Sequence, residues 1–232
     1  MPITDGFTTV YPNFNLLTDS KDFRNKNVPE ALVTTSITSP DSTIVKEGND
    51  TYLHFVRPRY EGGDWPQDWF KAYLIRDSSV SPNFLNVDVK PNTQYTFSVW
   101  LKGTGEHIII AYNNWTIPNP TTLTVNLTNT WTKYVLTVNT ATNITTNEAR
   151  FFIRSENVGT EINLKYPKVE EGSIATTWLP SKSELQNKLT PYMPSATELT
   201  TADISEYFGY NYIANQAYTY YGETNIDRLS RW

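Results

Sequence analysis

Two short segments of the sequence place large aromatic rings beside planar polar side chains. The first contains Arg57, Arg59, Tyr60, Asp64, Trp65, Gln67, Asp68 and Trp69, and the second contains Tyr112, Asn113, Asn114 and Trp115. A flat indole or phenol ring can pack on the apolar C–H face of a sugar, while amide, carboxylate and guanidinium groups hydrogen-bond to its hydroxyls. Both segments therefore predict saccharide contact.

Each of these rings also has a structural interpretation. The segment "WPQDWF", residues 65–70, follows the turn "EGGD", so one tryptophan could anchor a loop while the other meets a ligand. Trp100 falls on the polar side of a strand pattern, where it either lines a groove on the sheet face or packs under a loop. Trp131 precedes a strongly alternating strand and is predicted to be a core anchor. We include Trp100 among the predicted carbohydrate-binding residues.

Catalytic chemistry is weakly indicated. A glycosidase needs two carboxylates roughly 5–9.5 Å apart, and the candidates are Glu61, Asp64, Asp68 and Glu106. Any acidic chain supplies such residues, so solvated loop charge is the preferred interpretation. The histidines, His54 and His107, lie in strand-like segments and are predicted to be structural. The sequence contains no HExxH, GxSxG, Walker A or GxGxxG motif. We therefore predict no catalytic residues and a chain that is not an enzyme.

Alternation with a period of two residues dominates the middle of the chain. In "QYTFSVWLKG", residues 94–103, apolar side chains occupy every second position, which predicts a strand with one buried face. Gly103 and Gly105 then indicate a hairpin into a second strand, "EHIIIAYNNW". Residues 122–140 read as two strands joined near Asn129 and Thr130.

Two further regions extend the strand pattern. Residues 149–170 read as another pair of strands, turned around Asn157 and Gly159. Strand-like segments also flank "WPQDWF", which is predicted to be the loop between them. Short strands with turn signals about every 8–12 residues are typical of a sandwich. The predicted fold class is all-β, a two-sheet antiparallel β-sandwich.

Composition restricts the partners. The 232 residues carry a net charge of -5, and the sequence contains no Lys/Arg cluster that could form a basic patch. Nucleic acid is therefore not an expected partner. Cysteine is absent, which excludes disulfides and thiol nucleophiles. The start "MPITDGFTTV" lacks the features of a signal peptide, and no apolar run approaches membrane-spanning length. We expect no membrane association.

Several segments resemble the jelly-roll carbohydrate-binding modules of bacteriophage tail and baseplate proteins, from phages of lactic acid bacteria and their relatives. "NLLTDSKDF" is similar to the first strand of those modules, "YTFSVWLKG" to a central strand and "NTWTKYVLTV" to the strand after it. "YPKVEEGSIATTWLPSKSE" is similar to their closing strand and exit turn. "MPSATELTTADISEYFGY" resembles the tail that follows them.

The resemblance implies a jelly-roll sandwich that binds saccharides through one sheet face and its rim loops. Trp100 matches a recurrent ring of the family. Many relatives hold a structural Ca²⁺ between the first and last strands, but no ligand set can be matched in this sequence, and no other cofactor is implied. The implied location is the virion tail, after synthesis in the host cytoplasm.

The predicted organisation is an N-terminal arm (residues 1–12), a jelly-roll domain (13–181) and a Tyr-rich, partly helical extension (182–232), with a helix expected around residues 204–208. The leading hypothesis is a non-catalytic virion protein that recognises host cell-wall polysaccharide. The alternative is a spacer or assembly module that docks a neighbouring virion protein through its Tyr-rich C-terminus. A cell-wall glycan hydrolase is the lesser alternative.

Overall fold

The computed structural model describes residues 12–27, 37–39, 41–57, 67–75, 89–113, 115–144, 149–155, 157–189, 210–213 and 216–219. Contacts divide the chain into two compact units, one of residues 15–175 and one of residues 1–14 with 176–232. The predicted domain borders after residues 12 and 181 remain predictions, because a unit defined by contacts is not a test of independent folding.

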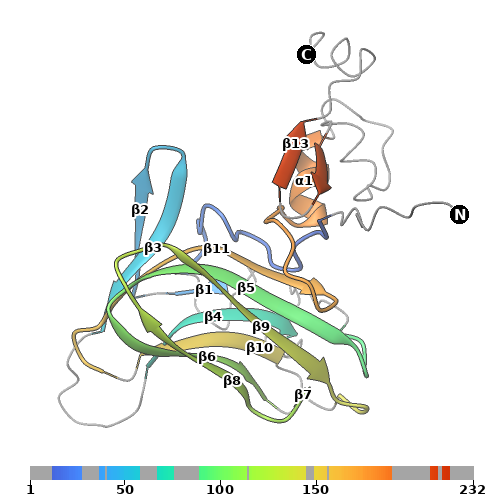
Figure 1. Cartoon of the computed structure of the whole chain (residues 1–232), viewed down its shortest axis with the longest axis horizontal. Helices are drawn as coiled ribbons and strands as arrows, with labels where there is room; N and C mark the ends of the chain where they lie inside the picture. The colour runs from blue at the N-terminus through green and yellow to red at the C-terminus, as the bar shows by residue number, and fades with distance from the viewer. Residues whose placement is uncertain are drawn as a thin grey trace, which may run out of the picture. The chain divides into compact units, whose positions relative to one another are not determined.

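Residues 15–175 form two antiparallel sheets (Figure 1). The five-stranded sheet has the order β1 (Ile37–Thr38), β4 (Gln67–Ile75), β10 (Ala149–Ser155), β6 (Gly105–Tyr112) and β8 (Thr121–Leu127). The six-stranded sheet has the order β2 (Thr43–Glu47), β3 (Asp50–Val56), β11 (Glu161–Glu171), β5 (Gln94–Gly103), β9 (Thr132–Thr140) and β7 (Thr116–Ile117). The predicted all-β jelly-roll sandwich is confirmed.

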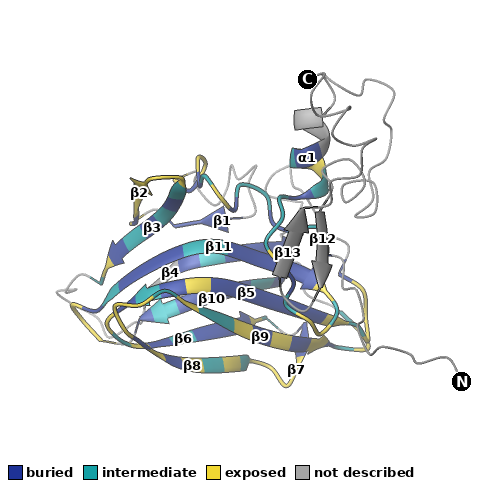
Figure 2. Cartoon of the chain, turned by 45° about the horizontal axis from the view of Figure 1, so that its top comes forward, coloured by how far each residue is buried: buried dark blue, intermediate teal, exposed yellow. Residues whose placement is uncertain are grey.

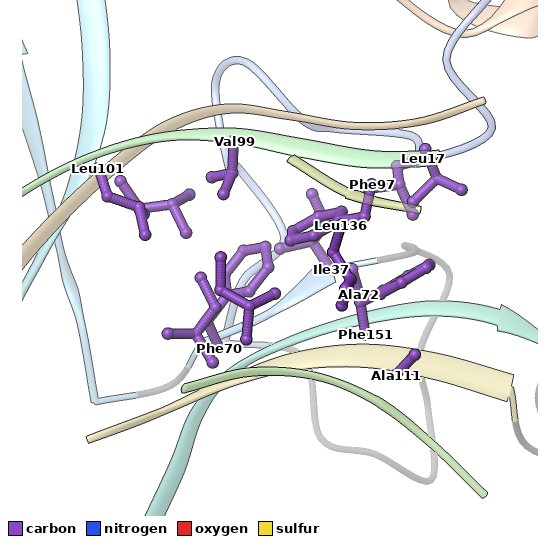
Figure 3. Close-up of a cluster of buried hydrophobic side chains, with 14 of the residues drawn as sticks. Leu17, Ile37, Phe70, Ala72, Phe97, Val99, Leu101, Ala111, Leu136 and Phe151 are labelled. Atoms are coloured by element: carbon purple, nitrogen blue, oxygen red, sulfur yellow. The ribbon is translucent and has the colours of Figure 1, made fainter. Parts of the chain in front are cut away.

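The hydrophobic core lies between the two sheets. The four apolar positions of β5 alternate as predicted and are all but fully buried: Tyr95, Phe97, Val99 and Leu101. Figure 3 shows Phe97, Val99 and Leu101 facing Phe70, Ala72 and Phe151 of the opposite sheet. The rings of Phe97 and Phe151 stack across the interface with centroids 4.9 Å apart. Along β8 and β9, exposed positions alternate with more buried ones (Figure 2).

The predicted hairpin at Gly103 and Gly105 is wrong, because β5 and β6 belong to different sheets. Both glycines sit where the chain crosses beside β11. A Cβ on Gly103 would lie 2.0 Å from the carbonyl oxygen of Glu161, and Gly105 has a φ of +79°. Only glycine tolerates this close backbone approach and this conformation without strain. The glycines therefore mark a crossing between sheets.

The other two predicted strand pairs also cross the sandwich. The strands found within residues 122–140 are β8 and β9, which lie in different sheets, and so do β10 and β11. The turn positions near Asn129 and Asn157 are as predicted, but the strands on either side pair with other partners. Turn chemistry is local, whereas pairing depends on which faces are buried together.

The predicted loop at "WPQDWF" is wrong over its second half. β4 begins at Gln67, because β10 continues to Ser155 and pairs Arg154 with Asp68 and Ser155 with Gln67. A register shift between Ile153 and Arg154 accommodates the pairing. Residues 58–66, which include the rest of the predicted loop, lie outside the described part of the chain.

The other unit contains a short helix and a hairpin. Ser181 caps α1 (Lys182–Leu189): its hydroxyl accepts from the Glu184 amide, and the Glu184 carboxylate accepts from the Ser181 amide. This reciprocal pair is a capping box. β12 (Tyr210–Ile213) pairs with β13 (Gln216–Thr219). The partly helical extension is confirmed, although the helix expected around residues 204–208 lies outside the described residues.

None of the helices in the described ranges is long and apolar enough to cross a membrane.

Candidate functional site

The sheet pairing separates the predicted binding residues into two groups. β4 and β6 flank β10, so Gln67, Asp68 and Trp69 on one side and Tyr112 on the other border the same central strand. Trp100 lies in β5 of the other sheet. Of the remaining predicted residues, Arg59, Tyr60, Asp64, Trp65 and Asn114 lie outside the described part of the chain, and only the backbone is described for residues 67–69.

The prediction that Trp115 meets a ligand is wrong. Its side chain is fully buried in the hydrophobic core. The indole packs edge-on against Tyr95, with ring centroids 6.5 Å apart, and against Phe151 at 5.3 Å. Trp115 ends a turn after β6 that leads the chain to β7 of the opposite sheet, which places its ring between the sheets. The position of Trp115 in a loop suggested exposure in the sequence. That loop connects the two sheets and turns the indole into the core.

Tyr112 lies on the solvent side of the five-stranded sheet, in a cluster with Phe152 and two arginines. Its side chain is 43% exposed, and its ring meets Phe152 edge-on with centroids 5.7 Å apart. The Arg150 guanidinium carbon lies 5.2 Å from the Tyr112 ring centre and 5.5 Å from that of Phe152. The Arg154 guanidinium lies over Phe152 at 5.4 Å. We call these four residues of β6 and β10 the Tyr112 surface.

The pairing register explains why the Tyr112 surface forms. Arg150 is the cross-strand partner of both Tyr112 in β6 and Tyr73 in β4, and Arg154 is the partner of Asp68. Phe151 and Ile153 face the core, so Arg150, Phe152 and Arg154 share the outer face. Guanidinium groups held over aromatic rings gain cation–π attraction and keep their planar donors oriented. The surface thus combines an exposed ring with fixed hydrogen-bond donors.

The sequence prediction missed Arg150, Phe152 and Arg154. The signal was present in "ARFFIRS", where two arginines and a phenylalanine alternate with core residues. No loop or turn signal marks this strand as a binding site. Among the side chains described on the outer face of this sheet, Glu106 is the only carboxylate, so they do not provide the pair of acids that a glycosidase needs.

Arg57 and Asn113 have local structural roles. The Arg57 guanidinium donates to the carbonyl oxygen of Ser155 at the end of β10. Its backbone amide donates to the carbonyl of Thr160 at 3.0 Å, which ties the end of β3 to the turn before β11. Asn113 is half-buried in the turn after β6, where a φ of 92° is tolerated best by asparagine and glycine.

Trp100 occupies the outer face of the six-stranded sheet and is 37% exposed. Trp131 lies on the same face and is half-buried, so its prediction as a core anchor is wrong. Its ring meets Tyr52 of β3 edge-on at 5.5 Å. Because β11 and β5 separate β3 from β9 in the sheet order, the Trp131 side chain lies across the two intervening strands.

The histidines are hydrogen-bonded within the sandwich, as predicted. His107 is fully buried, with Nδ1 2.9 Å from the Ser155 hydroxyl and Nε2 3.0 Å from the Thr104 carbonyl oxygen. Burial lowers the pKa of His107 below its usual value. His54 Nδ1 lies 3.0 Å from the side-chain oxygen of Asn163. These hydrogen bonds account for the position of both rings without a ligand.

Ion pairs hold the outer face of the six-stranded sheet together. Lys165 and Tyr166 both donate to the Asp50 carboxylate, and the hydrogen bond from Lys165 is the main cause that lowers the Asp50 pKa. Lys168 and Glu170 form a fully buried pair 3.2 Å apart. Burial lowers the pKa of Lys168 to about 8, against the opposing attraction of Glu170.

The described residues supply no group of three or more His, Cys, Asp or Glu side chains that could hold a metal ion. One oxygen-lined position is occupied by a lysine: the Lys26 ammonium donates to the side chain of Asn27 and to the carbonyls of Ser39 and Ser42. We therefore assign no residues to the calcium ion that the family resemblance implies.

The fold is that of a jelly-roll sandwich. Comparison with known proteins shows which proteins this chain is similar to. Residues 183–232 match the family described as the C-terminal domain of Dit. A 28-residue segment is 68% identical to the distal tail protein of Lactococcus phage SK1, and covers 12% of this chain and 9% of that protein. The predicted resemblance to phage tail proteins is confirmed by these two matches.

Two solved structures are similar to this chain at low sequence identity. The tripod (BppUct-A-L) from the baseplate of bacteriophage Tuc2009 has 20% identity and a TM-score of 0.46, covering 96% of this chain and 72% of that one. The CBM22-1 xylan-binding domain of Paenibacillus barcinonensis Xyn10C has 12% identity and a TM-score of 0.44, covering 72% of this chain and 99% of that one.

Proposed function

We propose that this chain is a non-catalytic component of a phage tail that recognises a saccharide of the host cell wall through the Tyr112 surface. The observation that carries the proposal is the exposed Tyr112 ring beside the Arg150 guanidinium, on an outer sheet face where Arg154 lies over the neighbouring Phe152 ring. The C-terminal match to the Dit family and the segment shared with a distal tail protein support the assignment to a tail.

The chemistry of the Tyr112 surface suits a sugar. The face of a pyranose can pack on the phenol ring, and the guanidinium N–H groups can donate to ring hydroxyls. Gln67, Asp68 and Trp69, which enter β4 on the other side of β10, remain proposed members of the same site. A shallow site of this kind binds weakly alone, and many copies on one particle would raise the effective affinity.

The proposal is tested by binding the fluorescently labelled full chain to purified host cell-wall polysaccharide. We expect binding by the natural chain and at least about a tenfold loss for Tyr112→Ala, which corresponds to about 1.4 kcal/mol. Ile44→Ala is the matched control, because Ile44 is an exposed apolar residue of the edge strand β2 in the other sheet. A folded natural chain that binds no saccharide refutes the proposal.

A second candidate function is virion assembly through the C-terminal extension. The observation that favours it is the match of residues 183–232 to the Dit C-terminal domain, a region with the Tyr-rich hairpin β12–β13. Tyrosine is enriched at protein interfaces. If the double substitution Tyr210→Ala and Tyr212→Ala abolishes incorporation into particles but leaves saccharide binding unchanged, assembly and recognition are separate. Incorporation at the natural level contradicts the docking role.

A further inference from the structure

The outer face of the six-stranded sheet carries a second cluster of rings and cations, on the sheet opposite to the Tyr112 surface. It consists of Tyr52, Trp100, Lys102, Trp131 and Lys165, and we call it the Lys102 surface. Lys102 and Lys165 both approach the Trp131 ring, with their ammonium nitrogens 5.1 Å and 4.5 Å from its centre. The rings therefore hold two cations at fixed positions on one face.

Lys102 and Lys165 differ in their hydrogen bonding. The Lys165 ammonium is paired with the Asp50 carboxylate, and its side chain is only 13% exposed. The Lys102 ammonium lies over Trp131 and, at 5.7 Å, over Tyr52, and within the described residues it makes neither a hydrogen bond nor an ion pair. Its three N–H donors thus remain available to a ligand.

Two of the three carboxylates near this surface are already partnered. Asp50 accepts from Lys165 and from the Tyr166 hydroxyl. Glu161 accepts from the Asn163 amide at 3.0 Å and lies 3.6 Å from His54. Glu47 is exposed at the end of β2, and its charge contributes, after burial, to the raised pKa of Tyr52. Among the described residues, none of these carboxylates forms an ion pair with Lys102.

An exposed ring stands next to this cation. Trp100 and Lys102 are two residues apart in β5 and share a face, which separates their Cα atoms by about 6.6 Å. Lys165 and Lys133 are the cross-strand partners of Trp100, so lysines flank the indole on both sides. The 37% exposed indole offers an apolar face, and Lys102 offers a cation beside it.

We infer that the Lys102 surface is a second saccharide-binding site, selective for a sugar that carries an anionic group, a carboxylate or a phosphate. The Trp100 indole contacts the sugar ring, and the Lys102 ammonium donates charge-assisted hydrogen bonds to the anion. Such bonds are stronger than neutral ones, so a neutral sugar of the same shape binds less tightly. This site is independent of the Tyr112 surface, because each belongs to the outer face of a different sheet.

The test measures affinities of the full chain by titration calorimetry for two matched pairs of probes. Trigalacturonate is compared with galactotriose, and galactose 6-phosphate with galactose. We expect the acidic member of at least one pair to bind about tenfold more tightly than its neutral counterpart, and Lys102→Gln to remove that difference. Lys46→Gln is the matched control, because Lys46 is an exposed lysine of β2 in the same sheet, outside the ring cluster.

Several results overturn the inference: acidic probes that bind no better than neutral ones, unchanged binding by Lys102→Gln, or inorganic phosphate alone binding as tightly as the acidic saccharides. If Lys102→Gln does not fold, Trp100→Ala tests the same site, since it should weaken the acidic probes as well. Tyr112→Ala should leave this binding intact. Failure of the proposed wall recognition and failure of the acidic-sugar site are therefore distinguishable.

Discussion

Replacing Trp115 with alanine separates a core role from a ligand-binding role. The side chain is fully buried and meets two rings, so its loss removes a large apolar group and leaves a cavity. Substitutions of this kind cost about 3–5 kcal/mol, a large part of the roughly 5–15 kcal/mol that stabilises a typical domain. Tyr112→Ala, at a residue 43% exposed, should cost less than about 1 kcal/mol.

Trp115→Phe refines this prediction. The indole Nε1 is buried and has no hydrogen-bond partner among the described residues. Phenylalanine loses part of the ring but also removes a buried N–H whose lack of a partner costs about 1–3 kcal/mol. The two effects offset, and we expect a net change within about 1 kcal/mol of the natural chain.

Urea unfolding of the full chain, followed by circular dichroism, measures these changes as shifts in the midpoint at constant slope. We expect the natural chain, Tyr112→Ala and Trp115→Phe to have similar stability, and Trp115→Ala to be far less stable than all three. If Trp115→Ala unfolds at the natural midpoint but loses saccharide binding, Trp115 is a ligand residue and the placement of its ring in the core is refuted.

Two further stability predictions follow from backbone packing and from the buried ion pair. In urea unfolding, Gly103→Ala should cost about 3 kcal/mol, because its Cβ would overlap the Glu161 carbonyl oxygen. Gly159 has open space around it but a φ of +80°, so Gly159→Ala should cost about 1 kcal/mol. Equal losses of stability in the two variants contradict the proposed overlap. The pKa of Lys168 is about 8 in the folded chain against the usual 10.5, so between these values the unfolded chain binds more protons. The free energy of unfolding should therefore rise with pH above about 8, by at most about 1.4 kcal/mol per pH unit. Lys168→Met should lack that rise. The same pH slope for the natural chain and Lys168→Met contradicts this assignment to Lys168.

The sequence predicted what depends on local alternation. The four core positions of β5 and the turns near Asn129 and Asn157 each follow from residues close together in the chain. Strand partnership did not follow. Gly103 and Gly105 look alike in a hairpin and in a crossing between sheets, and only the packing against Glu161 and Thr160 distinguishes the two.

The candidate sites were predicted in part for the same reason. Tyr112 and Trp100 were among the predicted binding residues, and both are exposed. They lie on different sheets, which no local sequence pattern reveals. Trp131 appeared to be a core residue because it borders an alternating strand, yet its ring lies across the outer face. The arginines of β10 were missed because their neighbours come from β4 and β6, distant in sequence.

The central claim is that the Tyr112 surface meets a host saccharide. The most direct measurement is NMR chemical-shift mapping of the full chain titrated with fragments of host cell-wall polysaccharide. The account predicts that the largest shifts occur at Tyr112, Arg150, Phe152 and Arg154 and that Tyr112→Ala abolishes them. Shifts confined to other parts of the chain, or no shifts from a folded protein, would contradict it.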